Sequence, residues 1–348
     1  MDIGAFHLAG LTSIMGIVLL LPLSVKKVEE EIEIFLFIMG LIAVTLSKKW
    51  SLGLVHESIV EPIKISLTVL LAGFLFRAGR SHVREVIAAI IKLLGLPLAM
   101  AAIVFLLGLA SSLITAIIAA LILAEIVTAL KLERAYEVRL VVYACYAIGL
   151  GAALTPLGEP LSTIVIGKLK GPPHNASFFF LFRLLGWWVI PGIAIVSAAC
   201  AWKVGKAVSA AESLNEDKVE ENKDICLRAA KVYLFVMALV YLGTGLGPLA
   251  DRTVSRAPNW ALFWINSVSA FLDNATLAAA EIVPSMGERT IRYALMGLLI
   301  SGGMLIPGNI PNIISAAKLR IGSREWAVLA VPMGLALMTG YFVLLLAL

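Results

Sequence analysis

Charged residues are scarce in this sequence. Only 15% of its 348 residues are Asp, Glu, Lys or Arg, whereas a soluble domain carries about 25%. Hydrophobic residues make up 60%, and the mean hydropathy is +0.97. This composition excludes a disordered chain, a coiled coil and an ordinary soluble enzyme, and it predicts an all-α polytopic membrane protein. At roughly 20–24 residues per span, the apolar stretches supply about nine to eleven membrane segments.

Cysteine and histidine are also rare. The three cysteines form no CxxC pair, so neither disulfides nor a structural zinc site is expected. The four histidines lie near span ends or in loops, which argues against a buried histidine metal site. The sequence contains no zinc-hydrolase motif and no Gly-x-Ser-x-Gly. We therefore expect no enzyme activity, with an intramembrane enzyme kept as a remote alternative. The net charge of +5 is small and scattered, so no nucleic-acid partner is expected.

The apolar windows define the organisation of the chain. They are 3–25, 34–47, 65–76, 86–124, 140–158, 184–201, 232–250, 257–272, 293–317 and 327–348. The window 86–124 is too long for one span, and we expect a break near Gly108–Ser112. Six acids and six bases lie between Lys203 and Lys231, which predicts a solvated linker. The predicted units are N-terminal spans (1–85), repeat 1 (86–203), the charged linker (204–228) and repeat 2 (229–348).

Two matched motifs indicate that the chain contains an internal repeat. Ala124-Glu-Ile-Val127 recurs as Ala280-Glu-Ile-Val283, an offset of 156 residues. Downstream, the segment 151–160 aligns with 302–311 at an offset of 151, matching a glycine, a leucine and two prolines. Lys168 and Lys318 close the two copies. Repeats with paired broken helices are typical of secondary transporters, whose sites lie near mid-membrane.

The hydropathy pattern leaves the direction of the repeats open. If the segments 111–130 and 260–283 are re-entrant hairpins, each repeat crosses three times and the two are inverted. If those segments span fully, each repeat crosses four times and the two are parallel. Polar residues at 267–276 favour a hairpin tip.

Both copies carry a helix-breaking motif between apolar segments. Proline removes a backbone donor and glycine permits an unwound path, and unwound backbone at membrane depth is tolerated where it lines a polar cavity. The polar candidates in these breaks are Thr155, Glu159, Asn309 and Asn312. Freed carbonyls suit a cation, and freed N–H groups suit an anion. The alternative is a pair of proline-kinked helices with a packing role only.

Three further acids lie within or beside apolar segments. Asp273 follows Ser269 at a helical i, i+4 spacing, and hydroxyl, amide and carboxylate oxygens are ligands of hard cations. A carboxylate there also binds protons, so ion and proton would compete; the alternative is that Asp273 or Asn274 simply caps a helix. Glu125 and Glu281 are candidate proton carriers, or they pair with the charged loops that follow them.

Several of these residues carry a family resemblance. Ser269-x-x-x-Asp273-Asn-Ala-Thr276, followed by the segment 301–312, resembles the second-half signature of the ion transporter superfamily, and the segment 149–160 is similar to its first-half counterpart. This superfamily includes D-type sodium/proton antiporters, arsenite and citrate permeases and dicarboxylate/sodium symporters. The strongest likeness is to a family of prokaryotic predicted cation transporters, over nearly the whole chain.

The resemblance implies inverted repeats, two re-entrant hairpins and a homodimer in a lipid bilayer. It places Asp273, Asn274 and Thr276 at a hairpin tip, as ligands of a bound sodium ion, and residues 155–160 and 307–312 in unwound segments. The symporters carry Ser-Asn-Thr in both halves, whereas here Ile117-Ile118 stand opposite Asp273-Asn274. A symmetrical two-sodium dicarboxylate site is therefore not expected.

These observations lead to one expected function and one alternative. The first is exchange of sodium or a similar monovalent cation for protons by a multi-pass protein of the cell (plasma or inner) membrane. Asp273 would be the shared ion and proton site, Glu159 a second acid, and the neutral ligands Asn274, Thr276, Ser269, Thr155, Asn309 and Asn312. The alternative is an oxyanion or carboxylate permease that uses helix N-termini as an anion cradle.

Overall fold

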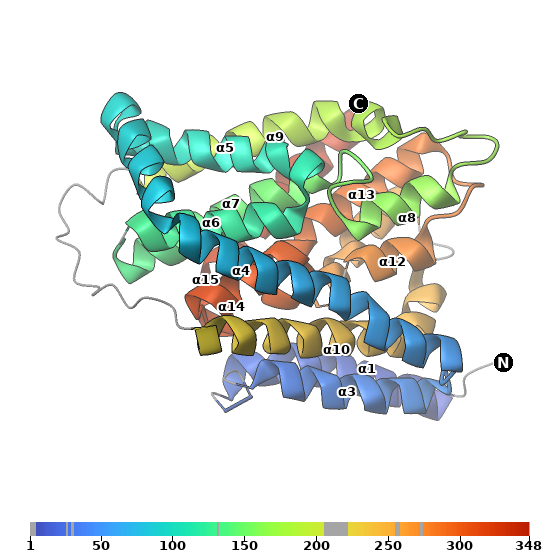
Figure 1. Cartoon of the computed structure of the whole chain (residues 1–348). Helices are drawn as coiled ribbons and strands as arrows, with labels where there is room; N and C mark the ends of the chain where they lie inside the picture. The colour runs from blue at the N-terminus through green and yellow to red at the C-terminus, as the bar shows by residue number, and fades with distance from the viewer. Residues whose placement is uncertain are drawn as a thin grey trace.

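The apolar windows form helices, because a chain in hydrocarbon must satisfy its backbone hydrogen bonds within itself. The computed structural model describes residues 5–25, 27–28, 31–130, 132–204, 222–254, 258–271 and 274–347, and these contain α-helices, short 3-10 helices and no strand (Figure 1). The helices of the first half are α1 (Ala5–Ser24), α3 (Ile32–Ser47), α4 (Leu52–Leu94), α5 (Leu96–Ile114), α6 (Ala116–Leu130), α7 (Arg134–Ala152), α8 (Pro160–Lys168) and α9 (Phe180–Val204). Those of the second half are α10 (Asn222–Val254), α11 (Asn259–Ile265), η2 (Asn266–Ala270), α12 (Asn274–Glu281), α13 (Glu288–Gly302), η3 (Ile306–Gly308), α14 (Ile310–Leu319) and α15 (Ser323–Ala347).

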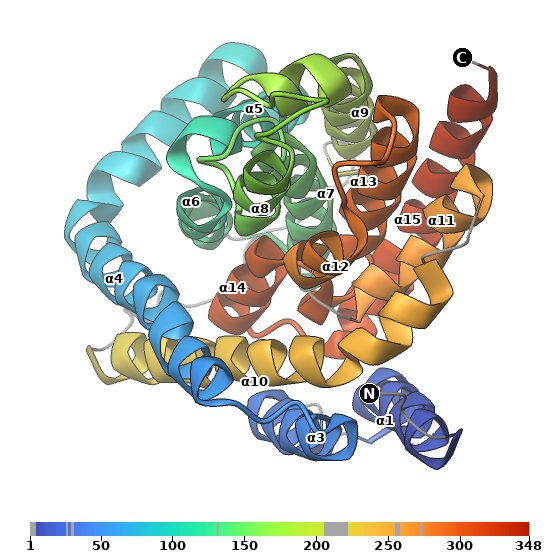
Figure 2. The ribbon, with the colours of Figure 1, turned by 90° about the vertical axis from the view of Figure 1, so that its right-hand side faces the viewer.

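The prediction of an all-α polytopic membrane protein is confirmed. Five described helices are long and apolar enough to cross a bilayer: α5, α7, α9, most of α10 and α15. Shorter apolar helices, α1, α3 and α6, accompany them. The helices lie side by side in one bundle, with α7, α12 and α14 in its middle (Figure 2).

The N-terminal helices lie on the outside of the second half. α1 and α3 pack on α10, and α4 crosses α10 on its way to α5 and α6 (Figures 1 and 2). α4 has 43 residues, about 64 Å at 1.5 Å per residue, which is twice the thickness of the hydrocarbon core. The predicted window 65–76 and the predicted boundary between residues 85 and 86 both lie inside this one helix. Residues 222–228 of the predicted linker belong to α10, and 205–221 lie outside the described residues.

The expected break near Gly108–Ser112 is wrong. α5 runs unbroken through those residues, and the chain turns instead at Gly95 and Thr115, whose φ angles of 73° and 76° lie in the left-handed region. Gly108 serves close packing, since a Cβ there would lie 2.9 Å from Ile193 and 3.1 Å from Ala147. A small residue inside a membrane helix therefore marked a helix contact rather than a helix end.

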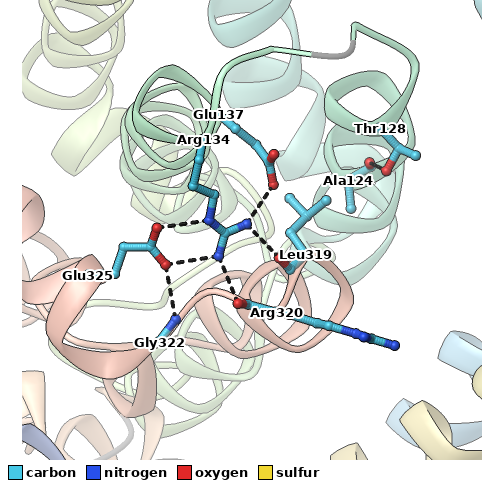
Figure 3. Close-up of polar contacts among 8 residues, drawn as sticks. All are labelled: Ala124, Thr128, Arg134, Glu137, Leu319, Arg320, Gly322 and Glu325. Carbon is cyan, nitrogen blue, oxygen red and sulfur yellow. Dashed lines mark hydrogen bonds and ion pairs between the residues drawn. The ribbon is translucent and has the colours of Figure 1, made fainter. Parts of the chain in front are cut away.

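The two broken helices run in opposite directions. Arg134, in the first turn of α7, donates to the carbonyls of Leu319 and Arg320 at the end of α14 and pairs with Glu325 of α15 at 2.8 Å (Figure 3). Lys168, at the end of α8, donates at 3.2 Å to the carbonyl of Ile282, in the segment that leads from α12 to α13. One end of the bundle thus holds the start of α7 and the end of α14, and the other holds the end of α8 and the start of α13. The repeats are inverted.

The hairpins have unequal arms. α12 has 8 residues, and α11 and η2 have 7 and 5, so these arms extend about 12 and 18 Å, well short of the roughly 30 Å core. In the first hairpin, α5 has 19 residues and α6 has 15, and they pack against each other on either side of Thr115. The second hairpin is therefore of re-entrant length, whereas α5 alone is long enough to cross.

Candidate functional site

The first break, residues 153–159, joins α7 to α8. It contacts the tip of the first hairpin, around Thr115. Thr155 Oγ1 donates to the Ser112 carbonyl, and the Ala116 amide donates to the Gly158 carbonyl at 2.8 Å. A Cβ at Gly158 would lie 2.0 Å from the Ala152 carbonyl oxygen, so this close approach requires glycine. Thr155 and Glu159 are both buried. The structure thus brings two predicted site residues into one polar, unwound segment beneath a hairpin tip.

The second break, residues 303–309, joins α13 to α14 in the same manner. Asn312 Nδ2 donates to the carbonyls of Gly302 and Leu305, both at 2.9 Å. Gly308 lies beneath the second hairpin, since a Cβ there would be 2.9 Å from the Ser269 carbonyl oxygen. The Asn312 side chain thereby satisfies the last carbonyl of α13, which lacks a helical donor, and a carbonyl within the break.

The two breaks correspond at an offset of 150 residues, not 151. Glu159 and Asn309 both stand at the N-cap, with φ of −156° and −155°. Cβ atoms at Gly158 and Gly308 would meet the carbonyl oxygens of Ala152 and Gly302, which end α7 and α13. The prolines matched in sequence differ by one position, because Pro160 is the first residue of α8 and Pro311 the second of α14. Neither position needs an N–H donor for the helix, so both accept proline.

Three buried asparagines surround the second break. Asn274, Asn309 and Asn312 are each at most 2% exposed, and among the described residues Asn274 Nδ2, Asn309 Nδ2 and Asn312 Oδ1 have no hydrogen-bond partner. Asn309 reaches the first repeat, since a Cβ at Gly149 of α7 would lie 2.6 Å from its Nδ2. Asn274 faces Gly302, with 3.7 Å between Nδ2 and the Cβ position there. A buried amide atom without a partner is costly, so this cluster is the best candidate for contact with a polar ligand.

The remaining residues of the hairpin tip are only partly described. Asp273 lies outside the described residues, and of Thr276 only its place in α12 is described. Ser269 is buried and its Oγ donates to the Leu298 carbonyl at 3.3 Å. No group of three His, Cys, Asp or Glu side chains comes together in the part of the chain that the structure describes.

Glu125 and Glu281 lie away from the breaks, toward the outer ends of the hairpin arms. Glu125 is nine residues into α6, about 14 Å from its start, and Glu281 ends α12. Glu125 forms a buried ion pair with Lys318 of α14, and Glu281 Oε2 accepts a 2.9 Å hydrogen bond from Asn266 Nδ2. The partners are thus a distant lysine and asparagine, rather than the charged loops that the sequence suggested.

Other side chains that support the second break were not among the predicted residues. A Cβ at Gly303 would lie 2.4 Å from the Tyr146 ring, and Trp326 Nε1 donates to the Gly303 carbonyl at 3.2 Å. Asn266 donates to the Ala294 carbonyl at 3.0 Å and accepts, through its own carbonyl, from Ser301 Oγ at 2.7 Å. Tyr146 lies within an apolar window and Trp326 directly before one, so only the contacts of these side chains reveal their role. Asn266 is different, because a polar amide within an apolar window already indicates a buried hydrogen-bonding role in the sequence.

Residues 8–348 match the family described as "protein of unknown function (DUF1646)". The chain belongs to this family. No curated protein matches the chain. Because the match extends over both breaks and both hairpins, the polar cluster described above belongs to the DUF1646 region itself.

Proposed function

We propose that this DUF1646 protein is a secondary active transporter that exchanges sodium, or a similar monovalent cation, for protons by alternating access. The observation that carries the proposal is the pair of inverted breaks, each beneath a hairpin tip and each lined by buried oxygen-bearing side chains. Glu159 in the first break and Asn309, Asn312 and Asn274 around the second supply carboxylate and amide oxygens. Such oxygens are the ligands that hard cations prefer.

The distribution of charge supports a cation over an anion. The break residues form hydrogen bonds with Ser, Thr, Asn and Trp side chains and with backbone groups. Lys168 and Lys318 each lie nine residues beyond the N-cap of α8 or α14, about 14 Å along the helix axis. The buried Glu159 carboxylate attracts a cation and repels an anion.

The mechanism rests on competition for carboxylates. Asp273 at the hairpin tip and Glu159 at the first break would each bind either a proton or, with neighbouring neutral oxygens, the cation. The neutral ligands would be Asn274, Thr276, Ser269, Thr155, Asn309 and Asn312. Rocking of one repeat against the other would then expose this central site to each side in turn. A homodimer in the cell membrane is part of the proposal.

One observation favours an oxyanion or carboxylate permease as the second candidate. The unpartnered Nδ2 atoms of Asn274 and Asn309 are donors, and α8 and α14 direct their N-terminal N–H groups into the breaks. An asparagine side chain carries both a donor and an acceptor, so each of these residues can present either its nitrogen or its oxygen to a ligand. The buried Glu159 disfavours this second candidate.

The experiment is a flux measurement on purified protein in liposomes that contain a pH-sensitive dye. An inward sodium gradient should drive protons outward and raise the internal pH, and Asp273→Asn and Glu159→Gln should abolish the response. Glu133→Gln is the matched control, because Glu133 is exposed at the start of α7. No response of the wild type across a series of alkali cations and pH values, together with uptake of a radiolabelled organic acid, would replace the antiporter with the permease.

A further inference from the structure

The repeat supplies two equivalent Glu and Lys residues, but the structure uses them differently. Glu125 of α6 corresponds to Glu281 of α12, and Lys168 of α8 to Lys318 of α14. α14 packs on α6, and α8 packs on α12. Each lysine therefore ends a helix of one repeat beside the second hairpin arm of the other repeat.

Among the described residues, one of these two possible cross-repeat ion pairs is formed. Lys318 Nζ contacts Glu125 Oε1, with the two side chains 5% and 10% exposed. Lys168 Nζ instead donates to the carbonyls of Ala279 and Ile282, which flank Glu281 in the chain. No ion pair joins Lys168 to Glu281 within the described part of the chain, and Glu281 accepts from Asn266.

One substitution between the repeats accounts for the carbonyls that Lys168 binds in this conformation. Pro284 follows Glu281 by three residues, where the first repeat has Thr128. Proline cannot donate to the carbonyl four residues earlier and disfavours helix in the residue before it, so α12 ends at Glu281 while α6 continues to Leu130. The last carbonyls of α12 therefore need outside donors, and Lys168 supplies them.

We propose that the two pairs are alternative locks of the two states of the transporter. In the conformation described here, Lys318–Glu125 fastens the first hairpin to the second repeat. In the opposite state the inverted repeats exchange their conformations, so that Lys318 leaves Glu125 and Lys168 moves from the flanking carbonyls to the Glu281 carboxylate. This inference rests on alternating access and is independent of the ion that is carried.

The test is cross-linking of one cysteine pair in a background without Cys145, Cys200 and Cys226. A bifunctional thiol reagent is applied to Lys168→Cys/Glu281→Cys, which keeps the Lys318–Glu125 lock intact. This pair should react slowly. Adding Glu125→Gln/Lys318→Met removes that lock without leaving a buried charge alone. The initial rate of cross-linking at 168/281 should then rise about tenfold, as expected when one state of a two-state equilibrium loses about 1.4 kcal/mol.

Controls separate this proposal from loss of folding and from failure of the proposed function. Lys170→Ala, an exposed lysine near Lys168, should leave the rate unchanged, and monodisperse elution in detergent confirms that each variant is folded. An unchanged 168/281 rate in a folded Glu125→Gln/Lys318→Met variant would overturn the exchange of locks. A raised rate in a protein without sodium-dependent proton flux would uphold the locks and reject sodium/proton antiport.

Discussion

The two breaks share a backbone path but differ in chemistry. At the same N-cap position, the first break has Glu159 and the second has Asn309, both buried and extended. Glycines at equivalent positions, Gly158 and Gly308, allow both segments to pass against the carbonyl that ends the preceding helix. The shape of the centre is thus duplicated, while an ionisable group stands on one side and an amide on the other. A duplicated site can in this way acquire two different roles without a change of fold.

The same contrast holds at the outer ends of the hairpin arms. Lys318 meets a carboxylate, whereas its counterpart Lys168 meets backbone carbonyls.

The largest predicted effect on the free energy of unfolding should therefore distinguish the two lysines. Lys318→Ala leaves Glu125 buried without this partner and should lower the free energy of unfolding by about 3–5 kcal/mol. Lys168→Ala removes only hydrogen bonds to carbonyls and should cost about 1–2 kcal/mol. Equal losses, measured by denaturant unfolding followed through tryptophan fluorescence, would contradict the contrast.

The next largest effect should come from the two glycines. A Cβ at Gly158 would lie 2.0 Å from the Ala152 carbonyl oxygen, and one at Gly308 would lie 2.5 Å from that of Gly302. Both Gly→Ala changes force the break away from the preceding helix and should cost about 1–3 kcal/mol, more at Gly158 than at Gly308. Gly167→Ala is the control, because nothing lies within 4 Å of a Cβ at that position of α8. If Gly167→Ala is as harmful as Gly158→Ala in thermal unfolding, the close approach is not the cause.

A comparable effect should separate Asn312 and Ser162, whose side chains donate to the carbonyls of Gly302 and Ala152 at the ends of α13 and α7. Asn312 donates two buried 2.9 Å hydrogen bonds, to Gly302 and Leu305, whereas Ser162 donates one, at 3.3 Å, to Ala152. Asn312→Ala should cost about 2–3 kcal/mol, and Ser162→Ala about 1 kcal/mol. Thermal unfolding of both variants against the wild type measures this order, and the reverse order would show that the breaks are held together by other contacts.

The smallest effect on stability should accompany the largest effect on transport. Glu159→Asn makes the two N-caps alike and should change the free energy of unfolding by less than about 1 kcal/mol, because asparagine is a favourable N-cap and the Glu159 side chain makes no capping hydrogen bond. Cation-dependent proton flux in liposomes should nevertheless be lost. Retained flux in this variant would remove Glu159 from the proposed mechanism and leave Asp273 as the only proposed acid at the centre.

Sequence patterns located the broken helices more accurately than the helix ends. The Gly-Pro motifs at 151–160 and 302–311 predicted both breaks, because proline and glycine act through local backbone geometry. The same reasoning predicted a helix break at Gly108, but this small residue serves packing against Ala147 and Ile193. It also aligned Pro160 with Pro311, although the first is at the first position of its helix and the second at the second position of its own. The cross-repeat partners of Glu125 and Glu281 were also missed, since Lys318 and Asn266 lie on other elements.

Composition and hydropathy alone determined that this chain is a helical membrane protein, because burying so much apolar surface with so little charge requires a bilayer. Repetition of motifs determined that it has two related halves with broken helices. Tertiary structure decided that the halves are inverted, because direction follows from which helix ends meet: Arg134 with Leu319, and Lys168 with Ile282. It also decided which buried polar groups converge, because Asn274 and Asn312 lie on different helices and only packing brings both side chains to Gly302.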